Sequence, residues 1–225
     1  GYDYAQRFAY PSGSLILAAT KTLPTFISGD KLTAYSAGTF ADVTGDGFDD
    51  LITTMPNVAV WTGDSSGNLS GPTVYDSGNE PEPVAVGDLA GNGRNDVAVY
   101  PTLSFGATST IQLYYQNATG GFDAPVNYTA TGEVSDAVIG DIDGDGRADL
   151  VYVSCETTSG GCMLGIGRQQ TDGTLAPEVL YPVYGPLPSY LGNTTQQHLV
   201  IEDINGDGLP DIVTGKTLLF ASPFQ

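Results

Sequence analysis

The chain has 225 residues, a size that suits one all-β domain, and 40% of them are hydrophobic, which excludes a disordered chain. Its formal net charge of −19 argues against nucleic acid or an anionic membrane surface as a partner. No apolar run approaches the roughly 20 residues that cross a bilayer, so membrane insertion is not expected.

Residues 1–33 contain two predicted strands, residues 2–10 and 14–20, on either side of Pro11-Ser12-Gly13. The whole chain holds 30 glycines and 14 prolines against two methionines. This balance favours short strands joined by tight turns over helices.

An acidic motif of nine residues then occurs four times, at residues 42–50, 88–96, 141–149 and 203–211. Every copy has Asp at position 1, Gly at positions 4 and 6, Asp or Asn at position 5, and Asp at position 9. If the backbone curls, the side chains at positions 1, 3, 5 and 9 converge, and the carbonyl of position 7 adds an oxygen. Calcium takes six to eight oxygen ligands, and crowded carboxylates repel one another without a cation. The motif therefore predicts up to four Ca²⁺ sites.

The predicted ligands differ between copies, with backbone carbonyls at position 7. They are Asp42, Thr44, Asp46, Phe48 and Asp50; Asp88, Asn92, Arg94 and Asp96; Asp141, Asp143, Asp145, Arg147 and Asp149; and Asp203, Asn205, Asp207, Leu209 and Asp211. Loop 141–149 has four carboxylates, loops 42–50 and 203–211 have three each, and loop 88–96 has two, with Ala90 at position 3. We expect calcium occupancy to fall in that order, with the site at 88–96 weakest.

Each motif lies between two short apolar segments, so it is predicted to form the turn of a hairpin. The segments before the motifs are 37–41, 84–86, 138–139 and 199–201; those after them are 51–55, 97–100, 150–153 and 212–214. Their nearly continuous apolar character predicts strands buried on both faces.

A second pair of strands with more polar alternation follows each of the first three hairpins, as expected for partly exposed strands. These pairs are 58–62 with 72–75, 110–116 with 125–129, and 162–168 with 178–183. Four strands per repeat predict a β-propeller of about four four-stranded antiparallel blades, with the calcium loop between the two inner strands. The repeats are 34–83, 84–133, 134–197 and an incomplete one at 198–225.

The two cysteines, Cys155 and Cys162, flank a short polar segment between apolar stretches, as in a disulfide that ties a hairpin. A zinc site is the alternative, but two thiols and one distant histidine suit it poorly. Four sequons, at Asn68, Asn117, Asn127 and Asn193, are candidate glycosylation sites. Together these features favour an extracellular protein, secreted or at the cell surface.

The four segments resemble the calcium-binding FG-GAP repeats of integrin α-subunit propellers and the related VCBS-type repeats of secreted microbial and algal proteins. The resemblance covers roughly residues 34 to 215, and its most specific part is the D-x-[DN]-G-[DN]-G-x-x-D core. It implies a propeller fold in which the loop between the inner strands of a blade binds calcium.

The last repeat has sequence for a third strand and no fourth, while residues 1–33 carry additional strands. These strands would complete the last blade in one of two ways. In their own chain they would close a ring of about four blades; in a neighbouring chain they would join copies head-to-tail into oligomers or fibres. We favour closure within the chain.

An enzyme is not expected. His198 is the only histidine, no nucleophile motif is present, and the carboxylates that resemble a glycosidase pair are better used as calcium ligands. The sequence favours a structural or adhesion module that binds copies of itself or another extracellular protein or glycan. A lectin is the alternative, because 13 tyrosines and Trp61 offer rings on which sugars stack.

Overall fold

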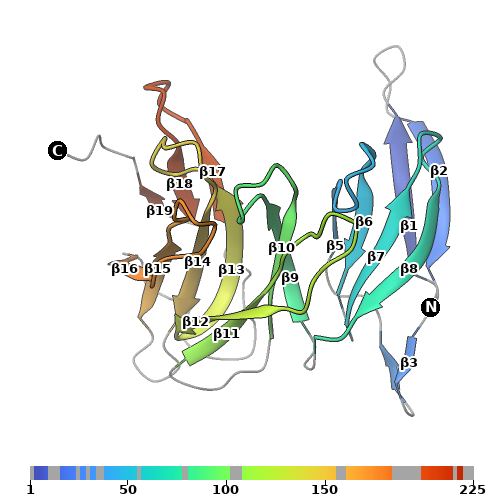
Figure 1. The fold of residues 1–225 in the computed structure, drawn as a ribbon, viewed down its shortest axis with the longest axis horizontal. Helices are drawn as coiled ribbons and strands as arrows, with labels where there is room; N and C mark the ends of the chain where they lie inside the picture. Colours follow the sequence, from blue (N-terminus) through green and yellow to red (C-terminus); the bar gives the residue numbers. More distant parts are fainter. Residues whose placement is uncertain are drawn as a thin grey trace.

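The computed structural model describes most of the chain, and all regular structure in it is β (Figure 1). The described residues are 3–9, 16–23, 26–28, 31–33, 38–54, 57–77, 81–101, 108–155, 161–183, 199–214 and 217–219. Within these ranges there is no helix long and apolar enough to span a membrane. Asn193 and His198 lie outside them.

Three sheets have four antiparallel strands and one has three; we call them blades 1 to 4 in chain order. Blade 1 contains β5 (Gly38–Ala41), β6 (Asp50–Thr53), β7 (Val58–Gly63) and β8 (Leu69–Tyr75). Blade 2 contains β9 (Pro81–Gly87), β10 (Asp96–Pro101), β11 (Thr108–Tyr114) and β12 (Val126–Thr131). Blade 3 contains β13 (Glu133–Gly140), β14 (Asp149–Cys155), β15 (Cys162–Gly167) and β16 (Val179–Pro182). Blade 4 contains β17 (Leu199–Glu202), β18 (Asp211–Thr214) and β19 (Thr217–Leu219).

Strands follow one another in sequence order across every blade, as the repeat pattern predicts. All four acidic motifs form the turn between the first and second strands of a blade. The first strands of blades 2 and 3 begin earlier than the apolar segments suggest, at Pro81 and Glu133, because backbone pairing continues through polar residues.

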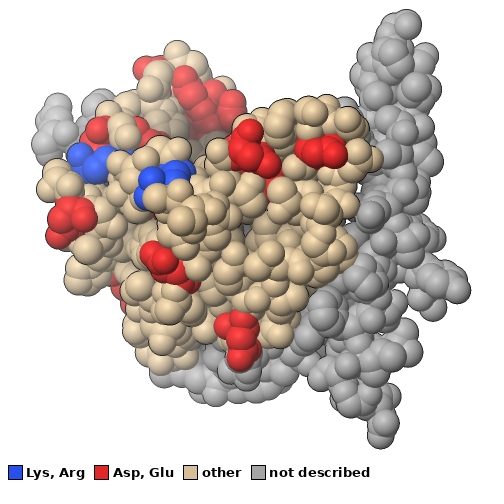
Figure 2. Space-filling view, turned by 45° about the vertical axis from the view of Figure 1, so that its right-hand side comes forward, with Lys and Arg blue, Asp and Glu red and all other residues tan. Residues whose placement is uncertain are grey.

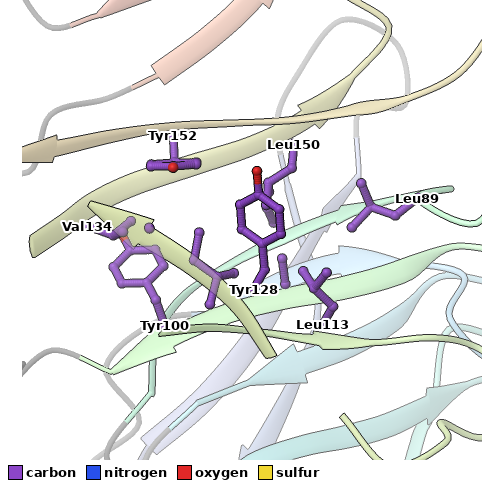
Figure 3. Close-up of a cluster of buried hydrophobic side chains, with 11 residues drawn as sticks. Leu89, Tyr100, Leu113, Tyr128, Val134, Leu150 and Tyr152 are labelled. Carbon is purple, nitrogen blue, oxygen red and sulfur yellow. The ribbon is translucent and has the colours of Figure 1, made fainter. Parts of the chain in front are cut away.

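The hydrophobic core lies between the blades. Side chains on one face of β10, including Val97 and Val99, pack with blade 1, whereas Ala98 and Tyr100 on the other face pack with blade 3. Figure 3 shows the layer between blades 2 and 3, where Tyr100, Leu113 and Tyr128 meet Leu150 and Tyr152. A third layer joins blade 3 to blade 4. Each blade is thus stabilised by burial against its neighbours.

Burial on both faces is confirmed for the second strands but is wrong for the first ones. All of β6 and nearly all of β14 are buried. By contrast, β5 has only half-buried and exposed positions and β17 has one buried position, Leu199, with Phe40 54% and Val200 48% exposed. The first strand is the edge of its sheet and has a strand on one side only, so it excludes less water than the second strand.

Glycines at the end of the first strands allow the next blade to approach closely. A Cβ on Gly87 of blade 2 would lie 2.4 Å from Ile139 Cγ2 of blade 3. A Cβ on Gly140 of blade 3 would lie 3.2 Å from Ile201 Cδ1 of blade 4. An isoleucine from the following blade therefore covers the residue before each of these two loops.

The N-terminal strands form two separate hairpins. One pairs β1 (Asp3–Ala9) with β2 (Ile16–Leu23), and the other pairs β3 (Phe26–Ser28) with β4 (Lys31–Thr33). Neither pairs with blade 4, and Figure 1 places the β1–β2 hairpin and blade 4 at opposite ends of the row of sheets. The closed ring that we favoured from the sequence is not present among the described strands.

The contact at Gly87 gives a test of the blade packing. We expect Gly87→Ala to lower the free energy of unfolding by about 1–3 kcal/mol, because the added methyl group collides with Ile139. Urea unfolding followed by circular dichroism measures this loss. In an Ile139→Ala background the same change should cost clearly less; equal costs in the two backgrounds would show that the packing is not as described.

Candidate metal centres

The aspartate at position 1 of every acidic loop accepts hydrogen bonds from backbone N–H groups further along the loop. In loop 141–149, Asp141 Oδ1 accepts from Gly144 N at 2.8 Å, and Oδ2 accepts from Gly146 N at 2.8 Å. Asp42, Asp88 and Asp203 accept corresponding bonds at 2.6–3.2 Å. The four loops therefore share one backbone frame, which the spacing of the motif predicts.

The residue at position 5 tightens the same turn. In every loop its Oδ1 accepts a hydrogen bond from the N–H of position 7, at 2.9–3.1 Å: Asp46 accepts from Phe48, Asn92 from Arg94, Asp145 from Arg147 and Asp207 from Leu209. The glycines at positions 4 and 6 have positive φ, 75° at Gly144 and 84° at Gly146. Residues with a Cβ adopt this conformation at a cost, which explains the glycines.

The aspartate at position 9 is buried, and in blades 1 to 3 it joins the loop to the end of the third strand. Asp50 accepts hydrogen bonds from the N–H groups of Val43, Thr44 and Gly63, each at 2.9 Å. Asp96 and Asp149 likewise accept from the second residue after β11 and β15, Gln116 at 2.8 Å and Gln169 at 2.9 Å. The sequence motif identifies these aspartates as metal ligands and does not reveal this structural role.

Burial of these aspartates disfavours their negative charge. Desolvation raises the pKa of Asp96 to about 6, although backbone N–H groups oppose the shift. Desolvation also raises the pKa of Asp149, with Asp143 and Asp145 adding repulsion. A bound divalent cation would compensate such charges, so the donor set fits calcium.

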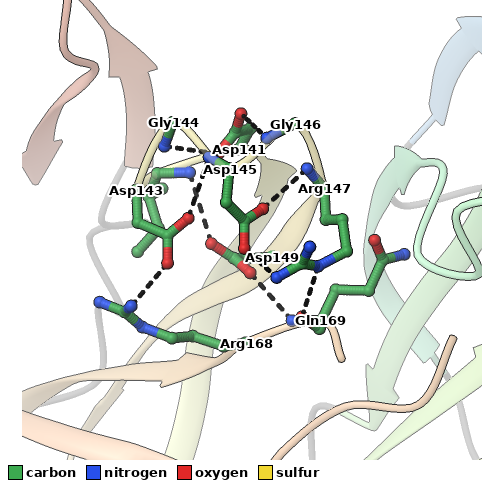
Figure 4. Close-up of polar contacts among 10 residues, drawn as sticks. Asp141, Asp143, Gly144, Asp145, Gly146, Arg147, Asp149, Arg168 and Gln169 are labelled. Carbon is green, nitrogen blue, oxygen red and sulfur yellow. Dashed lines mark hydrogen bonds and ion pairs between the residues drawn. The ribbon is translucent and has the colours of Figure 1, made fainter. Parts of the chain in front are cut away.

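Loop 141–149 brings three predicted ligands together. One oxygen each from Asp141, Asp143 and Asp149 lie within 4.8 Å of one another, and this is the one such acidic group among the described residues. Figure 4 shows that two arginines pair with the loop: Arg168 Nη1 lies 2.5 Å from Asp143 Oδ2, and Arg147 pairs with Asp145. Asp145 is thus turned to Arg147 and does not join the group.

The other loops are more open, and their carboxylates do not form a group of this kind within the described chain. In loop 42–50, Thr44 Oγ1 is buried and has no hydrogen-bond partner in the described part of the chain. An unpaired buried hydroxyl is costly, and this one sits at a predicted ligand position, so loop 42–50 also fits a cation. Loop 88–96 has no oxygen on Ala90 to contribute.

The arginines at position 7 have a contact that the motif did not reveal. Arg94 Nε donates to the carbonyl of Gln116 at 3.0 Å, and Arg147 Nε donates to the carbonyl of Gln169 at 3.1 Å. In blades 2 and 3 the loop is therefore fastened to the end of the third strand by both its seventh and its ninth residue.

The predicted disulfide between Cys155 and Cys162 is confirmed; it joins paired residues of β14 and β15. Of the sequon residues, Asn68 is exposed before β8 and Asn127 is exposed on β12. Asn117 is half-buried and accepts bonds from Thr119 and Gly121 in its turn. Glycosylation at these positions stays a prediction.

Substitution of Asp50 should separate its structural role from metal binding. We expect Asp50→Ala to lower the free energy of unfolding by at least about 2 kcal/mol in chelator, because buried N–H groups lose their acceptor. The matched control, Asp46→Ala in the same loop, removes an exposed carboxylate and should change stability by less than about 1 kcal/mol. Equal losses for the two variants without metal would refute the structural role of Asp50.

A comparison with protein families finds the FG-GAP-like repeat at residues 102–152. This segment runs from the outer strands of blade 2 through β13 and loop 141–149 into β14. A comparison with curated proteins finds no match. FG-GAP repeats commonly bind calcium, and the matched segment contains the acidic group described above. Residues 102–152 are therefore an FG-GAP-like repeat, as the sequence motif predicts.

Proposed function

We propose that this chain is a non-enzymatic, calcium-binding propeller module that acts as a structural or adhesion element outside the cell. The observation that carries this proposal is the convergence of Asp141, Asp143 and Asp149 in a loop whose backbone frame recurs in every blade. The disulfide supports an oxidising compartment.

Calcium would act here as a clamp. Each loop joins the first two strands of a blade, and its ninth residue also reaches the third strand in blades 1 to 3. The bound ion supplies positive charge to carboxylates that are held together in the folded chain. Because the unfolded chain does not hold them together, metal binding adds directly to stability.

The distribution of charged side chains on the surface also supports a partner other than a polyanion. On the face shown in Figure 2, acidic side chains are spread over several elements and basic ones gather in one area. The aromatic residues behind the lectin alternative are partly unavailable: Trp61 is 2% exposed, and Tyr100, Tyr114 and Tyr152 are buried in the core. We therefore favour the structural module.

Self-assembly is the second part of the proposal. Blade 4 has three described strands with β19 at the edge of this set, while the β1–β2 hairpin pairs with no other described strand. Donation of an N-terminal strand to a neighbouring chain would extend this edge by backbone pairing. Chains joined in this way form a head-to-tail series, which is an oligomer when it closes and a fibre when it does not.

The last blade also has a face like those that other blades cover. The apolar residue at position 2 of the loop is buried in blades 1 to 3, at Val43, Leu89 and Ile142, whereas Ile204 of blade 4 is 50% exposed. The first three pack in clusters that include residues of the following blade. This difference supports the proposal that another sheet packs against blade 4 and covers Ile204.

Calcium removal tests the first part of the proposal. We expect the thermal unfolding midpoint to fall in EGTA, since each occupied site contributes about 2.7 kcal/mol at a calcium concentration 100 times its Kd. Circular dichroism measures the midpoint, and metal analysis of dialysed protein counts bound calcium, up to four ions. An Asp143→Asn/Asp145→Asn variant is the control and should bind one ion fewer. Equal midpoints with calcium and EGTA would refute calcium binding.

Deletion of residues 2–20 tests the second part. With calcium present, the full chain should form oligomers or filaments in light scattering and negative-stain microscopy, and the deleted chain should remain monomeric with an unchanged unfolding midpoint. A full chain that stays monomeric at all concentrations would refute strand donation. A large loss of monomer stability on deletion would instead favour closure within the chain.

A further inference from the structure

Two side-chain amides connect the metal loops of successive blades. Asn95 Nδ2, at position 8 of loop 88–96, donates to the carbonyl of Asp42 in blade 1 at 2.9 Å. Gln169 Nε2, after β15 of blade 3, donates to the carbonyl of Asp88 in blade 2 at 3.1 Å. Different residues thus reach the same acceptor, the carbonyl of the first loop residue in the preceding blade.

Both donors are fixed by the metal loop of their own blade. Asn95 is the residue between Arg94, whose carbonyl is a predicted ligand, and Asp96. Gln169 is held by its backbone, because its N–H donates to Asp149 Oδ1 at 2.9 Å and its carbonyl accepts from Arg147 Nε at 3.1 Å. Any ordering of these loops therefore also orders the donor.

In blades 2 and 3, the turn after the third strand also lies close to the metal loop of the preceding blade. A Cβ on Gly120 of blade 2 would lie 2.7 Å from the carbonyl oxygen of Thr44, and one on Gly173 of blade 3 would lie 2.8 Å from that of Ala90. These contacts leave loops 42–50 and 88–96 little room to move without the following blade.

Among the described residues, no such contact reaches the other two loops. A Cβ on Gly144 or Gly206, at position 4, would meet nothing within 4 Å, whereas one on Gly45 would lie 3.5 Å from Gln116 Nε2 and one on Gly91 would lie 3.3 Å from Gln169 Oε1. The residue of blade 4 that corresponds to Asn95 is Pro210, which has no N–H group to donate. The supported loops are the ones in blades 1 and 2, including loop 88–96 with only two carboxylates.

We propose that Asn95 and Gln169 are positioning residues that couple calcium binding in successive blades. An ion in loop 141–149 fixes Gln169 and thereby raises the calcium affinity of loop 88–96. An ion in loop 88–96 fixes Asn95 and thereby raises the calcium affinity of loop 42–50. The physical reason is that a loop already held in place loses less conformational entropy when it binds. Because coupling is reciprocal, the cooperativity is positive in both directions. The inference rests on the proposed calcium binding.

The backbone frame provides one spectroscopic reporter for each loop. The N–H groups of Gly47, Gly93, Gly146 and Gly208 each donate to Oδ2 of the first aspartate in their loop. A calcium titration of the full chain, followed by the amide resonances of these glycines, therefore gives four separate midpoints.

We expect Gln169→Leu, which keeps the size of the side chain but cannot donate, to raise the calcium midpoint of Gly93 about three- to tenfold. The midpoint of Gly146 should rise less, because loop 141–149 is expected to fill first and the coupling then acts mainly on the loop that fills later. Asn95→Ala should raise the midpoint of Gly93 by a similar factor and should also raise that of Gly47, because coupling between loops 42–50 and 88–96 is reciprocal. The matched control is Gln116→Leu: Gln116 occupies in blade 2 the place of Gln169, and its amide atoms have no partner within the described chain. This control should leave the midpoint of Gly47 unchanged.

An additional variant tests coupling itself. Asp143→Asn/Asp145→Asn, which weakens loop 141–149, should raise the midpoint of Gly93 when Gln169 is present and have a smaller effect in the Gln169→Leu background. Unchanged Gly93 and Gly47 midpoints in the Gln169→Leu and Asn95→Ala variants would overturn the coupling while leaving calcium binding intact. If no glycine responds to calcium, the proposed function fails and the coupling fails with it. Should Gln169→Leu not fold, Asn95→Ala and the Gly47 midpoint decide the question.

Discussion

The hydrogen bonds that backbone N–H groups donate to aspartate side chains hold this structure together. A loop that curls within nine residues cannot pair its N–H groups with a neighbouring strand, and unpaired buried N–H groups are costly. The aspartate at position 1 accepts those on the outside of the curl, and the aspartate at position 9 accepts those near the core. Because Asp50 also accepts from Gly63, the last residue of the third strand, one side chain contacts three strands of blade 1. The repeated motif therefore specifies the repeated blade.

The same arrangement concentrates negative charge. Twelve of the 26 acidic residues occupy predicted ligand positions, and four bound divalent ions would change the formal charge from −19 to −11. Near loop 141–149 the folded chain supplies Arg147 and Arg168 as partial compensation. Both pair with carboxylates that an ion would use, so an ion and the arginines compete for the same oxygens. Loops 42–50 and 203–211 have Phe48 and Leu209 at position 7 in place of arginine, so no cation at that position compensates their carboxylates.

Local features were predictable from the sequence, and contacts between distant residues were not. The curl of each loop, the hairpins and the pairing of Cys155 with Cys162 all follow from residues close together in the chain. The bond from Asn95 to Asp42 joins residues 53 positions apart, and a single sequence does not show which side chains meet across a blade interface. The exposure of β5 was missed for a related reason: an apolar segment reads the same at the edge of a sheet as at its centre.

The contacts at every blade interface run in the same direction along the chain. Residues of the following blade cover the loop of the preceding one: Ile139 lies on Gly87, and Asn95 reaches Asp42. The outermost faces of blades 1 and 4 are therefore unlike. On blade 1 Phe40 is exposed while its cross-strand neighbours Leu51 and Trp61 are buried, and on blade 4 Ile204 is 50% exposed. Unlike faces that fit each other cannot form a two-fold symmetric dimer with themselves; they either close a ring or continue from one copy to the next. The shared direction of the contacts through which the loops support one another thus also determines how copies of this chain would join.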